Sequence, residues 1–403
     1  MDQHLFSGLR VIDCATVIAA PAAAMMLADF GADVIKIERP GVGDILRLLS
    51  DVDFTPDADN DWFWQMDGRN KRGLTLDVTA PGGAEVMRRL VAGADVFITN
   101  YPHPVRESLG LSHDALREIN PALVYASLTA YGEQGPERDR RGFDQLAYWA
   151  RSGLMELMRE PGTRPTQGLP GMGDHPTGVA LYASIVTALL HRERTGEGSY
   201  VHTSLLANGL WSAAGIAQGV LAGGDMASYR ETNVVYSPML RPYEALDGGW
   251  LQFNMIRDEE ALLMLLVALD ATHLLQDPRF GSIDVMVDEQ REAFGDEIQA
   301  VIATKSGADW LAVFVEHDLP VNLVALVEET ATDPQIRHNS MAVQPSDPGI
   351  ATPWIVRHPV NVDGIDPVEP SHAPELGEHT AEILDELGYS TVEIENLRST
   401  GTV

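Results

Sequence analysis

Cysteine and lysine are both scarce in this sequence of 403 residues. The sole cysteine, Cys14, excludes an intrachain disulfide and any zinc or iron–sulfur site built from several cysteines. It stands beside Val11, Ile12 and Ala15 in an apolar run, where a free cysteine usually behaves as a small buried side chain. Because lysine is so rare, arginine supplies most of the positive charge. The low cysteine content is typical of a reducing, cytoplasmic compartment.

Long apolar runs and an excess of positive charge are missing as well. No segment approaches the roughly eighteen uninterrupted apolar residues of a membrane-spanning helix, and residues 1–10 lack the basic and apolar stretches of a signal peptide. The net charge of -31 repels phosphate backbones and anionic lipid headgroups. We therefore expect a cytoplasmic protein that has neither nucleic acid nor a membrane as its partner.

Several widespread catalytic motifs are absent. The first predicted strand-to-helix turn, residues 15–24, contains no glycine and so lacks the G-x-G-x-x-G loop that cradles a dinucleotide. There is no Walker A loop, no G-x-S-x-G elbow and no H-E-x-x-H motif, which argues against the commonest nucleotide triphosphatases, hydrolases and zinc proteases. The histidines are scattered without metal-ligand spacing, so we expect no metal site and a structural or surface role for each histidine.

Strands and helices alternate along the first half of the chain. Short apolar runs predict strands, and longer segments with helical period predict helices. This rhythm predicts an α/β protein with a Rossmann-like parallel sheet covered by helices. The predicted strands are Leu9–Ala15, Asp33–Glu38, Asp95–Thr99, Leu123–Thr129 and Tyr200–Thr203, and the predicted helices are Pro21–Phe30, Gly83–Val91, His113–Ile119 and Pro176–Arg194.

The character of the sequence changes near Val235. A proline-containing stretch, a turn and an apolar strand at Trp250–Asn254 precede a mostly helical pattern. Further on, residues 360–374 lack helical period and predict an extended connection, before a closing helix at Gly377–Leu387. The length exceeds what one hydrophobic core usually organises. We predict that the chain is organised in three stretches: residues 1–225 form most of a large domain, residues 226–335 form a smaller α+β domain, and residues 336–403 form a return segment that completes the large domain.

One acidic residue stands between glycine-rich backbone and the start of a predicted helix, in the segment Leu169–Gly178. From the residues alone, Asp174 is most simply a helix N-cap. A functional interpretation is also open, because Gly171 and Gly173 let a ligand approach the backbone, and free N–H groups at a helix N-terminus stabilise developing negative charge. A carboxylate in this position can attack a thioester.

Ordered blocks of residues run along the whole chain: Gly8–Asp13, Ala20–Ala23, Leu27–Arg39, Asn70–Asp77, Ala94–Asn100, Gly173-Asp-x-x-x-Gly178, Arg194–Gly198 and Ala373–Thr380. In these blocks the chain resembles the class III CoA-transferase family, which includes formyl-CoA and carnitine CoA-transferases and, as a side branch, the α-methylacyl-CoA racemases. The resemblance implies a large Rossmann-like, CoA-binding domain with a smaller α+β domain, and an interlocked homodimer. It also favours the catalytic role for Asp174 over capping alone.

The resemblance implies an enzyme that moves CoA from an acyl-CoA thioester to a free carboxylic acid. In the family, the aspartate that matches Asp174 attacks the thioester and gives a mixed anhydride, which CoA thiolate converts into an aspartyl-CoA thioester. Gly173 belongs to the same motif. Asp144 is a candidate for orienting Asp174 or its substrate, with an N-cap or surface role as the alternative. CoA is thus expected as a cosubstrate, without a permanently bound cofactor.

The resemblance further implies a set of CoA contacts. Arginine is well suited to phosphate recognition. Relatives commonly carry an arginine where this chain has Ser108, so the nearby Arg106 is the candidate for that contact. Val17 and Leu76 can equally be core residues, and Arg39 a solvated charge. The expected CoA contacts are Thr16, Val17, Ala19, Arg39, Leu76, Asn100, Tyr101, Arg106 and Arg141, and the expected acyl-pocket residues are Ile18 and Phe143.

Two residues of the expected acyl pocket separate the possible functions. Ile18 stands where formyl-CoA transferase has a polar side chain, which favours a larger or more apolar acid over oxalate. Phe143 stands where the racemases carry a histidine, and since phenylalanine cannot carry a proton, a racemase is the less favoured alternative. The glycine-rich loop that closes over the site in formyl-CoA transferase has no counterpart in residues 235–247. A nicotinamide oxidoreductase and a non-catalytic acyl-CoA-binding protein are alternatives from other classes, and neither has positive support in the sequence.

Overall fold

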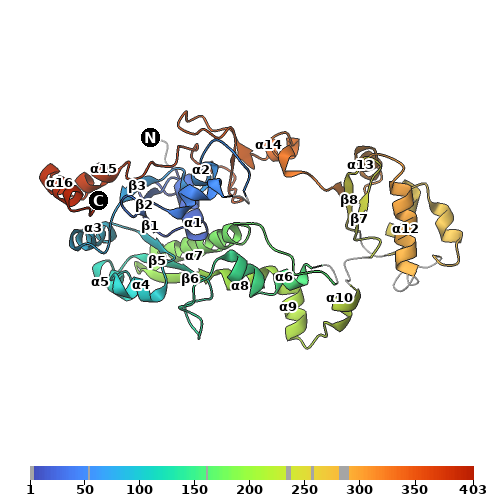
Figure 1. Ribbon diagram of the computed structural model, residues 1–403, viewed down its shortest axis with the longest axis horizontal. Coiled ribbons are helices and arrows are strands. Elements are labelled where there is room, and N and C mark those ends of the chain that lie inside the picture. The colour runs from blue at the N-terminus through green and yellow to red at the C-terminus, as the bar shows by residue number, and fades with distance from the viewer. Residues whose placement is uncertain (1–3, 53–54, 160–161, 233–236, 256–257, 281–289) are drawn as a thin grey trace. The chain divides into compact units, whose positions relative to one another are not determined.

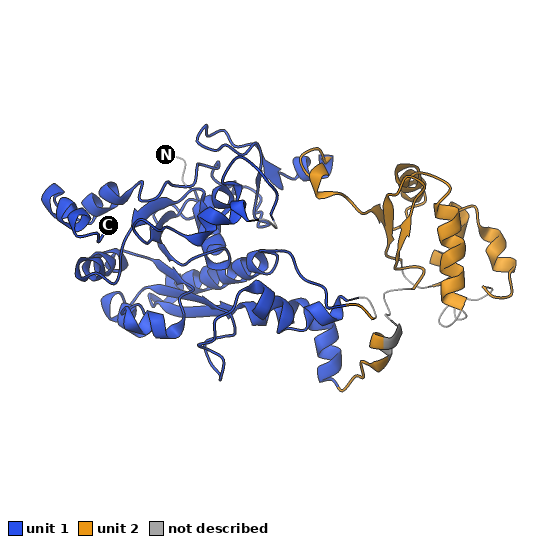
Figure 2. Cartoon of the chain, viewed as in Figure 1, with its two compact units in different colours: residues 1–159, 164–222, 334–403 blue, residues 160–163, 223–333 orange. Residues whose placement is uncertain are grey.

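The computed structural model describes residues 4–52, 55–159, 162–232, 237–255, 258–280 and 290–403, which form two compact units (Figure 2). Unit 1 comprises residues 1–159, 164–222 and 334–403, and unit 2 comprises residues 160–163 and 223–333. The chain therefore leaves unit 1 and later returns to it. The predicted domain boundaries, after residues 225 and 335, stay a prediction, because compactness alone does not show that either part folds independently.

A six-stranded sheet forms the centre of unit 1. Its strands are β1 (Arg10–Cys14), β2 (Asp33–Glu38), β3 (Arg72–Thr75), β4 (Val96–Thr99), β5 (Val124–Thr129) and β6 (Ser199–Ser204). They lie in the order β3-β2-β1-β4-β5-β6, and every neighbouring pair is parallel. The prediction of a parallel α/β sheet is confirmed. From β1 the chain first adds β2 and β3 on one side of the sheet and then β4, β5 and β6 on the other side. In a doubly wound sheet, ligands bind outside the carboxyl ends of the two strands where this order reverses, which are β1 and β4 here.

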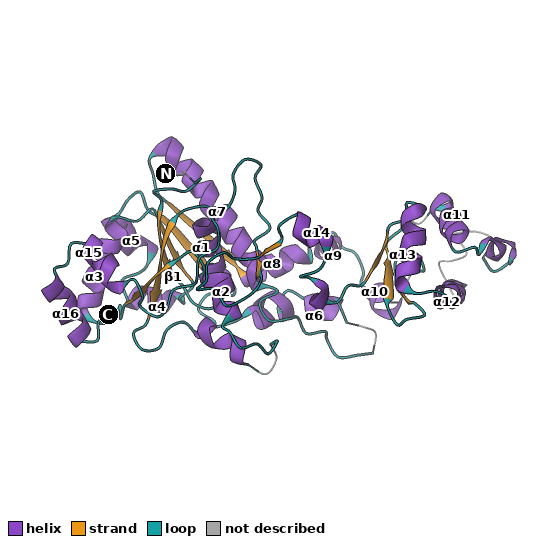
Figure 3. Ribbon diagram, turned by 90° about the horizontal axis from the view of Figure 1, so that it is seen from above, coloured by secondary structure: helices purple, strands orange, loops and turns teal. Residues whose placement is uncertain are grey.

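Helices cover both faces of this sheet (Figures 1 and 3). One face carries α1 (Ala19–Asp29) and α7 (Asp174–Thr195), and the other carries α3 (Pro81–Ala92), α5 (His113–Ile119), α15 (Thr380–Glu386) and α16 (Thr391–Ser399). Successive side chains of a strand point to opposite faces, so Val11 joins the first core cluster and Ile12 the second. Burial on both faces explains why β4 and β5 in the middle of the sheet are buried along their whole length, whereas the edge strand β6 alternates between partly buried and exposed residues.

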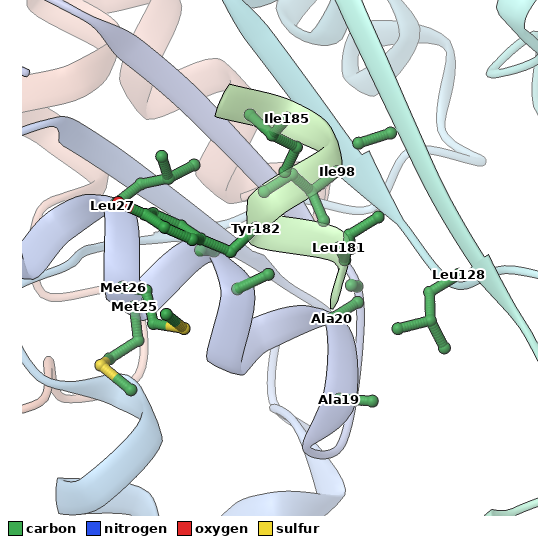
Figure 4. Packing of buried hydrophobic residues seen from close by; sticks show 14 of the residues in the cluster. Ala19, Ala20, Met25, Met26, Leu27, Ile98, Leu128, Leu181, Tyr182 and Ile185 are labelled. Carbon is green, nitrogen blue, oxygen red and sulfur yellow. The ribbon is translucent and has the colours of Figure 1, made fainter. Parts of the chain in front are cut away.

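Helices α1 and α7 pack closely against each other (Figure 4). Leu181, Tyr182 and Ile185 of α7 are buried in the same cluster as the alanines of α1. A Cβ atom on Gly178 would lie 2.7 Å from the backbone oxygen of Ala19, so only glycine fits at this crossing. The glycine that ends the Gly173-Asp-x-x-x-Gly178 motif is thus a packing residue, and it brings the N-terminus of α7 beside the turn that follows β1.

The sequence pattern found the regular elements of this sheet but missed shorter ones. The predicted helix at 176–194 begins two residues earlier, at Asp174. The strand β3 was not predicted, because an arginine and a glycine take up the first two of its four residues and leave no apolar run. The remaining elements of unit 1 before its return segment are η1 (Ile45–Asp51), α2 (Trp62–Gly68), α4 (His103–Ser108), the π-helix η2 (Gln145–Ala150), α6 (Leu154–Leu157), α8 (Leu205–Ser212) and α9 (Ala214–Leu221).

Unit 2 has an antiparallel sheet of β7 (Pro242–Glu244), β8 (Trp250–Phe253) and β9 (Val321–Leu323) with its own core, which includes Phe253 and Phe314. Of the stretch 235–247, where no glycine-rich loop was found, the first two residues lie outside the described ones. No single described helix is both long and apolar enough to cross a membrane. Two consecutive helices, Gln290–Ile302 and Gly307–Glu316, reach that length and hydropathy only when taken together, and they are bent by 107° relative to each other. The helices are α10 (Ala227–Thr232), α11 (Glu259–Ala268), η4 (Thr272–Gln276), α12 (Gln290–Ile302), α13 (Gly307–Glu316) and η6 (Val327–Glu329), and the bent pair is α12 with α13.

The return segment carries α14 (Pro334–His338), β10 (Ala342–Val343) and β11 (Ile355–Val356) before α15. Residues 360–374 contain no helix and no strand beyond an isolated bridge, which confirms the predicted extended connection. Its end is held on unit 1 by hydrogen bonds to the Pro374 carbonyl oxygen, which accepts from the indole of Trp64 (3.1 Å) and from Arg47 (2.8 Å).

Candidate active site

Two polar residues meet where the strand order reverses. Thr16 follows β1 and Asn100 follows β4. The Thr16 amide donates to Asn100 Oδ1 (2.9 Å), and Asn100 Nδ2 donates back to the Thr16 carbonyl oxygen (2.7 Å). This reciprocal pair fixes the turn after β1 at the place where a doubly wound sheet binds its ligand. Both residues were predicted as CoA contacts.

The next residue of this turn has an unusual backbone. Val17 has φ of 68°, in the left-handed region that a β-branched residue rarely adopts, at a cost of order 1–3 kcal/mol. Its amide donates to Asp44 Oδ1 (3.0 Å), and the same oxygen accepts from the Leu46 amide (3.0 Å). The glycine-free turn therefore reaches a glycine-like conformation because Asp44 holds it there.

One buried lysine pairs with Asp44 and another with Asp13. Lys36 Nζ donates to Asp44 Oδ2 (2.7 Å) and to the Ala15 carbonyl oxygen, and Lys71 Nζ donates to Asp13 Oδ2 (2.9 Å). Burial alone would lower the pKa of Lys36, but the charges of Asp13 and Asp44 raise it, so this lysine stays charged. Two of the rare lysines thus stabilise the turn after β1, a role that the sequence did not reveal.

Asp174 is the first residue of α7. Its side chain makes no capping hydrogen bond, and Gly173 occupies the N-cap position, so the N-cap interpretation was wrong. The backbone amide of Asp174 instead donates to the Gly171 carbonyl oxygen (3.1 Å). Burial, together with the charge of Asp144, raises the pKa of the Asp174 carboxyl to about 7. A carboxylate that has lost part of its hydration and whose pKa lies near 7 is a stronger nucleophile than the carboxylate of an ordinary aspartate.

Asp144 is 5% exposed and lies close to Asp174. Its Oδ1 accepts from the Gln145 amide (2.7 Å) at the start of the π-helix η2, which confirms the N-cap alternative for Asp144. Its role in orienting Asp174 or the substrate stays a prediction. Burial raises the pKa of Asp144, while the amides of Gly173 and Gly171 oppose this shift. The sequence analysis gave the glycines to the ligand, but a Cβ atom on Gly173 would lie 2.6 Å from the ring of Tyr148, so this glycine is required by packing.

His175 follows the aspartate and was missed, because the sequence gives no sign of its partner. Its Nε2 lies 3.3 Å from Oδ2 of the buried Asp67, and its Nδ1 lies 3.1 Å from the Gly171 carbonyl oxygen. Both ring nitrogens face acceptors, an arrangement that only the doubly protonated imidazolium satisfies. Although burial opposes the charged form, Asp67 raises the pKa of His175 to about 9. A positive charge therefore stands beside Asp174 and lowers the pKa of that carboxyl.

The exchange of His175 for glutamine should shift the pH dependence of the enzyme. For a mechanism in which the ionised form of Asp174 attacks the thioester, kcat/KM is expected to rise with pH through a midpoint near 7. The His175→Gln variant keeps an N–H donor for Asp67 but removes the positive charge, so the midpoint should move to higher pH. The measurement is kcat/KM across about pH 5 to 9. An unchanged midpoint would show that His175 does not control the ionisation of Asp174.

A first cavity, of about 410 Å³, opens at the turn after β1. Thr16, Ala19 and Asn100, which were expected as CoA contacts, line it together with Asp174. Its opposite wall is the segment 138–143, which supplies three arginines where the sequence analysis named one. The arginines are Arg138, Arg140 and Arg141. Three cations clustered within four residues could have been recognised as an anion site from the sequence.

A second cavity, of about 580 Å³, adjoins the first, since the two share Val17, Ile18, Phe143 and Asp174 in their lining. Its other walls come from η1, from α2 and from the segment 167–171 that precedes Asp174. They are mostly apolar and include the side chains of Ile45, Leu49, Val52, Phe63 and Leu169. Asp174 thus lies where a cavity with cationic walls meets one with apolar walls.

Four of the expected CoA contacts line neither cavity. Arg106 is 3% exposed and its guanidinium pairs with Glu133 (2.8 Å), so the side chain is not accessible to a phosphate. The side chain of Leu76 is 2% exposed and belongs to the second core cluster, against which Tyr101 also packs. For Arg106 and Leu76 the expectation was wrong, because neither side chain is accessible to a ligand. Arg39 is exposed beyond β2, outside both cavities.

Cys14 is fully buried in β1, as predicted, and burial raises the pKa of its thiol to about 12. A thiol with such a pKa is not a nucleophile at neutral pH. In the described part of the chain, no three or more His, Cys, Asp and Glu side chains are placed to hold a metal ion. The carboxylate of Asp174 is therefore the group in this site to which a covalent role can be assigned.

Known proteins share both the sequence and the fold. Residues 6–380 match the model of CoA-transferase family III. The chain is 31% identical over 400 residues to the (R)-2-hydroxy-4-methylpentanoate CoA-transferase of Clostridioides difficile, covering 99% of each chain. It is 31% identical over 405 residues to the cinnamoyl-CoA:phenyllactate CoA-transferase of Clostridium sporogenes, covering 98% of this chain and 96% of that one.

Among solved structures, a CAIB/BAIF family protein from Brucella suis superposes with a TM-score of 0.81 at 28% identity, covering 96% of this chain and 100% of that one. Fold and sequence therefore lead to the same family, which confirms the resemblance. The chain belongs to CoA-transferase family III and is an enzyme that transfers CoA between acyl-CoA thioesters and carboxylic acids.

Proposed function

We propose that Asp174 is the covalent nucleophile of this CoA transfer. The observation that carries the proposal is its position, at the junction of a cavity lined by arginines and a cavity lined by apolar side chains. In an acyl-CoA thioester, the C–S bond joins the acyl group to the phosphate-bearing CoA chain. The apolar cavity suits the acyl group, and the cavity lined by arginines suits the CoA chain. The raised pKa of Asp174 adds nucleophilicity, and the neighbouring imidazolium of His175 favours the ionised form.

The transfer then takes place in balanced steps. The Asp174 carboxylate attacks the thioester carbonyl, the C–S bond breaks, and a mixed anhydride and CoA thiolate form. The thiolate attacks the aspartyl carbonyl of the anhydride, which releases the donor acid and leaves an aspartyl-CoA thioester. The carboxylate of the acceptor acid attacks that thioester, and the released thiolate attacks the acceptor half of the new anhydride. The acceptor leaves as its CoA thioester and Asp174 is regenerated.

We assign CoA to the first cavity and the acyl group to the second. Arg138, Arg140 and Arg141 suit the CoA phosphates, with Thr16, Val17, Ala19 and Asn100 along the CoA chain. Ile18 and Phe143 lie where the two cavities meet, as expected for acyl-pocket residues.

The acceptor acid that we propose is an apolar monocarboxylic acid. Among the described residues that line the second cavity there is no Lys, Arg or His, so a second carboxylate of a dicarboxylic acid would find no counter-ion there. The two relatives compared above are named for acids with branched aliphatic or aromatic bodies, which agrees with the apolar walls. Burial of a branched or aromatic group against them contributes about 25 cal/mol per Å² of apolar area.

The nucleophile is tested by intact-mass spectrometry after incubation with branched-chain and aromatic acyl-CoA thioesters. We expect a CoA or acyl adduct on the native protein, converted by hydroxylamine into a hydroxamate that maps to Asp174. The Asp174→Ala variant should carry no adduct. Asp114→Ala is the matched control, because the Asp114 side chain is 97% exposed on α5 and should leave adduct formation unchanged.

An adduct on another residue would contradict the assignment of Asp174. If no adduct formed on either protein but the α-proton of the acyl group exchanged with solvent, racemase-like chemistry would replace transfer for this site. The interlocked homodimer and the use of CoA purely as a cosubstrate are implied by the family resemblance, and we propose them on that ground alone.

A further inference from the structure

The second cavity is larger than a short acyl group requires. Its volume is about 580 Å³, within the range of about 300–1,000 Å³ in which proteins enclose most of a drug-sized ligand. A methylene group takes up about as much space as a water molecule in the liquid, roughly 30 Å³, so the cavity has room for about ten carbon atoms or more. A short acyl group would leave much of the apolar wall in contact with water.

One end of this cavity lies next to the candidate nucleophile. Asp174 and Ile18 both line it, and a Cβ atom on Gly171 would lie 3.4 Å from Cδ1 of Ile18. Ile18 and Phe63 are buried in one apolar cluster, and Leu49 packs against that cluster. An acyl group whose carbonyl reacts with Asp174 therefore starts between packed apolar walls.

Another part of the cavity wall is equally apolar but open to solvent. Ile45, Phe143 and Leu169 line the cavity, and they are 55%, 66% and 69% exposed; we call these three residues the rim. A single exposed apolar residue is ordinary, but a group of them that borders one cavity is typical of a ligand site. Each rim residue is followed, three positions later in the chain, by another exposed apolar side chain, and these are Leu48, Leu146 and Met172.

Charged groups do not interrupt the wall between Asp174 and the rim. Apart from Asp144 and Asp174, no described residue that lines this cavity carries a charge, and these two lie at the end where the thioester carbonyl would react. The hydroxyl of Thr55 and the side-chain amide of Gln145 already donate to backbone carbonyl oxygens. A long apolar chain can therefore lie along this wall without burying an unpaired charge beneath it.

We propose that this enzyme transfers CoA to and from medium- and long-chain apolar acids, of about ten carbon atoms or more, whose far end reaches the rim. This inference rests on the proposed function, which it makes more specific. Each methylene that leaves water for an apolar cavity strengthens binding by up to about fourfold, so a chain that extends to the rim is favoured over a short one.

The test measures how kcat/KM depends on the length of the acceptor acid. Hexanoyl-CoA serves as the CoA donor, and the acceptors are the unbranched acids butanoate, octanoate, decanoate and dodecanoate. We expect kcat/KM to rise by about 100-fold or more from butanoate to decanoate, because every added methylene is removed from water. In Leu169→Asp, which places a charge at the rim, the ratio of kcat/KM for decanoate to that for butanoate should fall by about tenfold or more.

Leu190→Asp is the matched control. Leu190 is an exposed leucine of α7 that lines neither cavity, so this exchange should leave the ratio of decanoate to butanoate at its native value. The mass of both variants in solution is measured by light scattering. If Leu169→Asp had a lower mass than the native protein but kept the native ratio, the rim would be a contact between subunits, and this inference would be overturned.

A native enzyme that uses butanoate as well as decanoate, or better, would also overturn this inference and would leave the proposed function intact. The same holds if Leu190→Asp lowered the ratio as much as Leu169→Asp does. If the native enzyme transferred CoA to none of these acids, the proposed function would be wrong, and this inference with it.

Discussion

The Asp174→Asn variant should lose CoA transfer by at least about 10³-fold in kcat/KM, because the amide cannot form an anhydride or a thioester. The exchange keeps the size of the side chain at the start of α7, so the walls of both cavities stay in place. Binding of CoA, measured by isothermal titration calorimetry, should therefore change only a few-fold. Transfer at a rate close to that of the native enzyme would refute the covalent role.

The same variant should not be destabilised, and this separates a lost nucleophile from a damaged fold. The pKa of Asp174 is raised from 3.8 to about 7, chiefly by burial. Between those pH values the folded state holds the proton more tightly than the unfolded state, so the contribution of Asp174 to stability falls as pH rises through that window. Above it, the native protein carries an unfavourable ionised carboxylate that Asn lacks. At about pH 8 the Tm of Asp174→Asn should equal or exceed that of the native protein.

Replacement of Lys36 by methionine should destabilise the protein by about 3–5 kcal/mol, because it leaves the buried carboxylate of Asp44 without its cation. The side chains of Lys36 and Asp44 are each 1% exposed, so water cannot take the place of the lost partner. Since Asp44 also holds the Val17 amide in the turn after β1, kcat/KM should fall along with stability. Equilibrium urea unfolding followed by circular dichroism measures the first effect, and the transfer assay measures the second.

Lys305→Met provides the control for this exchange. Lys305 is exposed, and its ammonium lies 4.2 Å from the ring centroid of Trp310, a contact worth about 0.5–1 kcal/mol at an exposed site. The exchange of Lys305 for methionine should therefore lower the free energy of unfolding only slightly and leave CoA transfer unaffected. If both variants unfolded at the same urea concentration, the buried network under the turn would not have the importance that we assign to it.

Much of the fold of unit 1 could be read from the sequence, because its strands are buried on both faces and its helices have one apolar side. The run Asp33–Glu38 was predicted with the bounds that β2 has. The strand β3 was missed because its pairing with β2, rather than the composition of its own four residues, makes it a strand. The π-helical turn at Gln145–Ala150 likewise has no sequence pattern of its own.

The residues of the candidate site likewise fall into those that the sequence pointed to and those that only the structure revealed. Asp174 could be singled out from its place before a predicted helix, and Thr16, Asn100 and Asp144 were expected from the family resemblance. The partners of those residues come from distant segments: Asp67 lies 108 positions from His175, and Thr16 lies 84 positions from Asn100. Arg106 could not be recognised as an internal ion pair, because Glu133 comes from another part of unit 1.

The sequence by itself determined the class of fold, through local periodicity, and it indicated the family and the candidate nucleophile, through contiguous blocks of residues that resemble that family. Only the tertiary structure decided what surrounds the Asp174 carboxylate: which histidine stands beside it as a cation, which lysine holds Asp44 under the turn after β1, and which side chains line the two cavities. Burial and electrostatic contact between distant segments set the ionisation and the specificity of a site, and neither quantity is written in any one stretch of the chain.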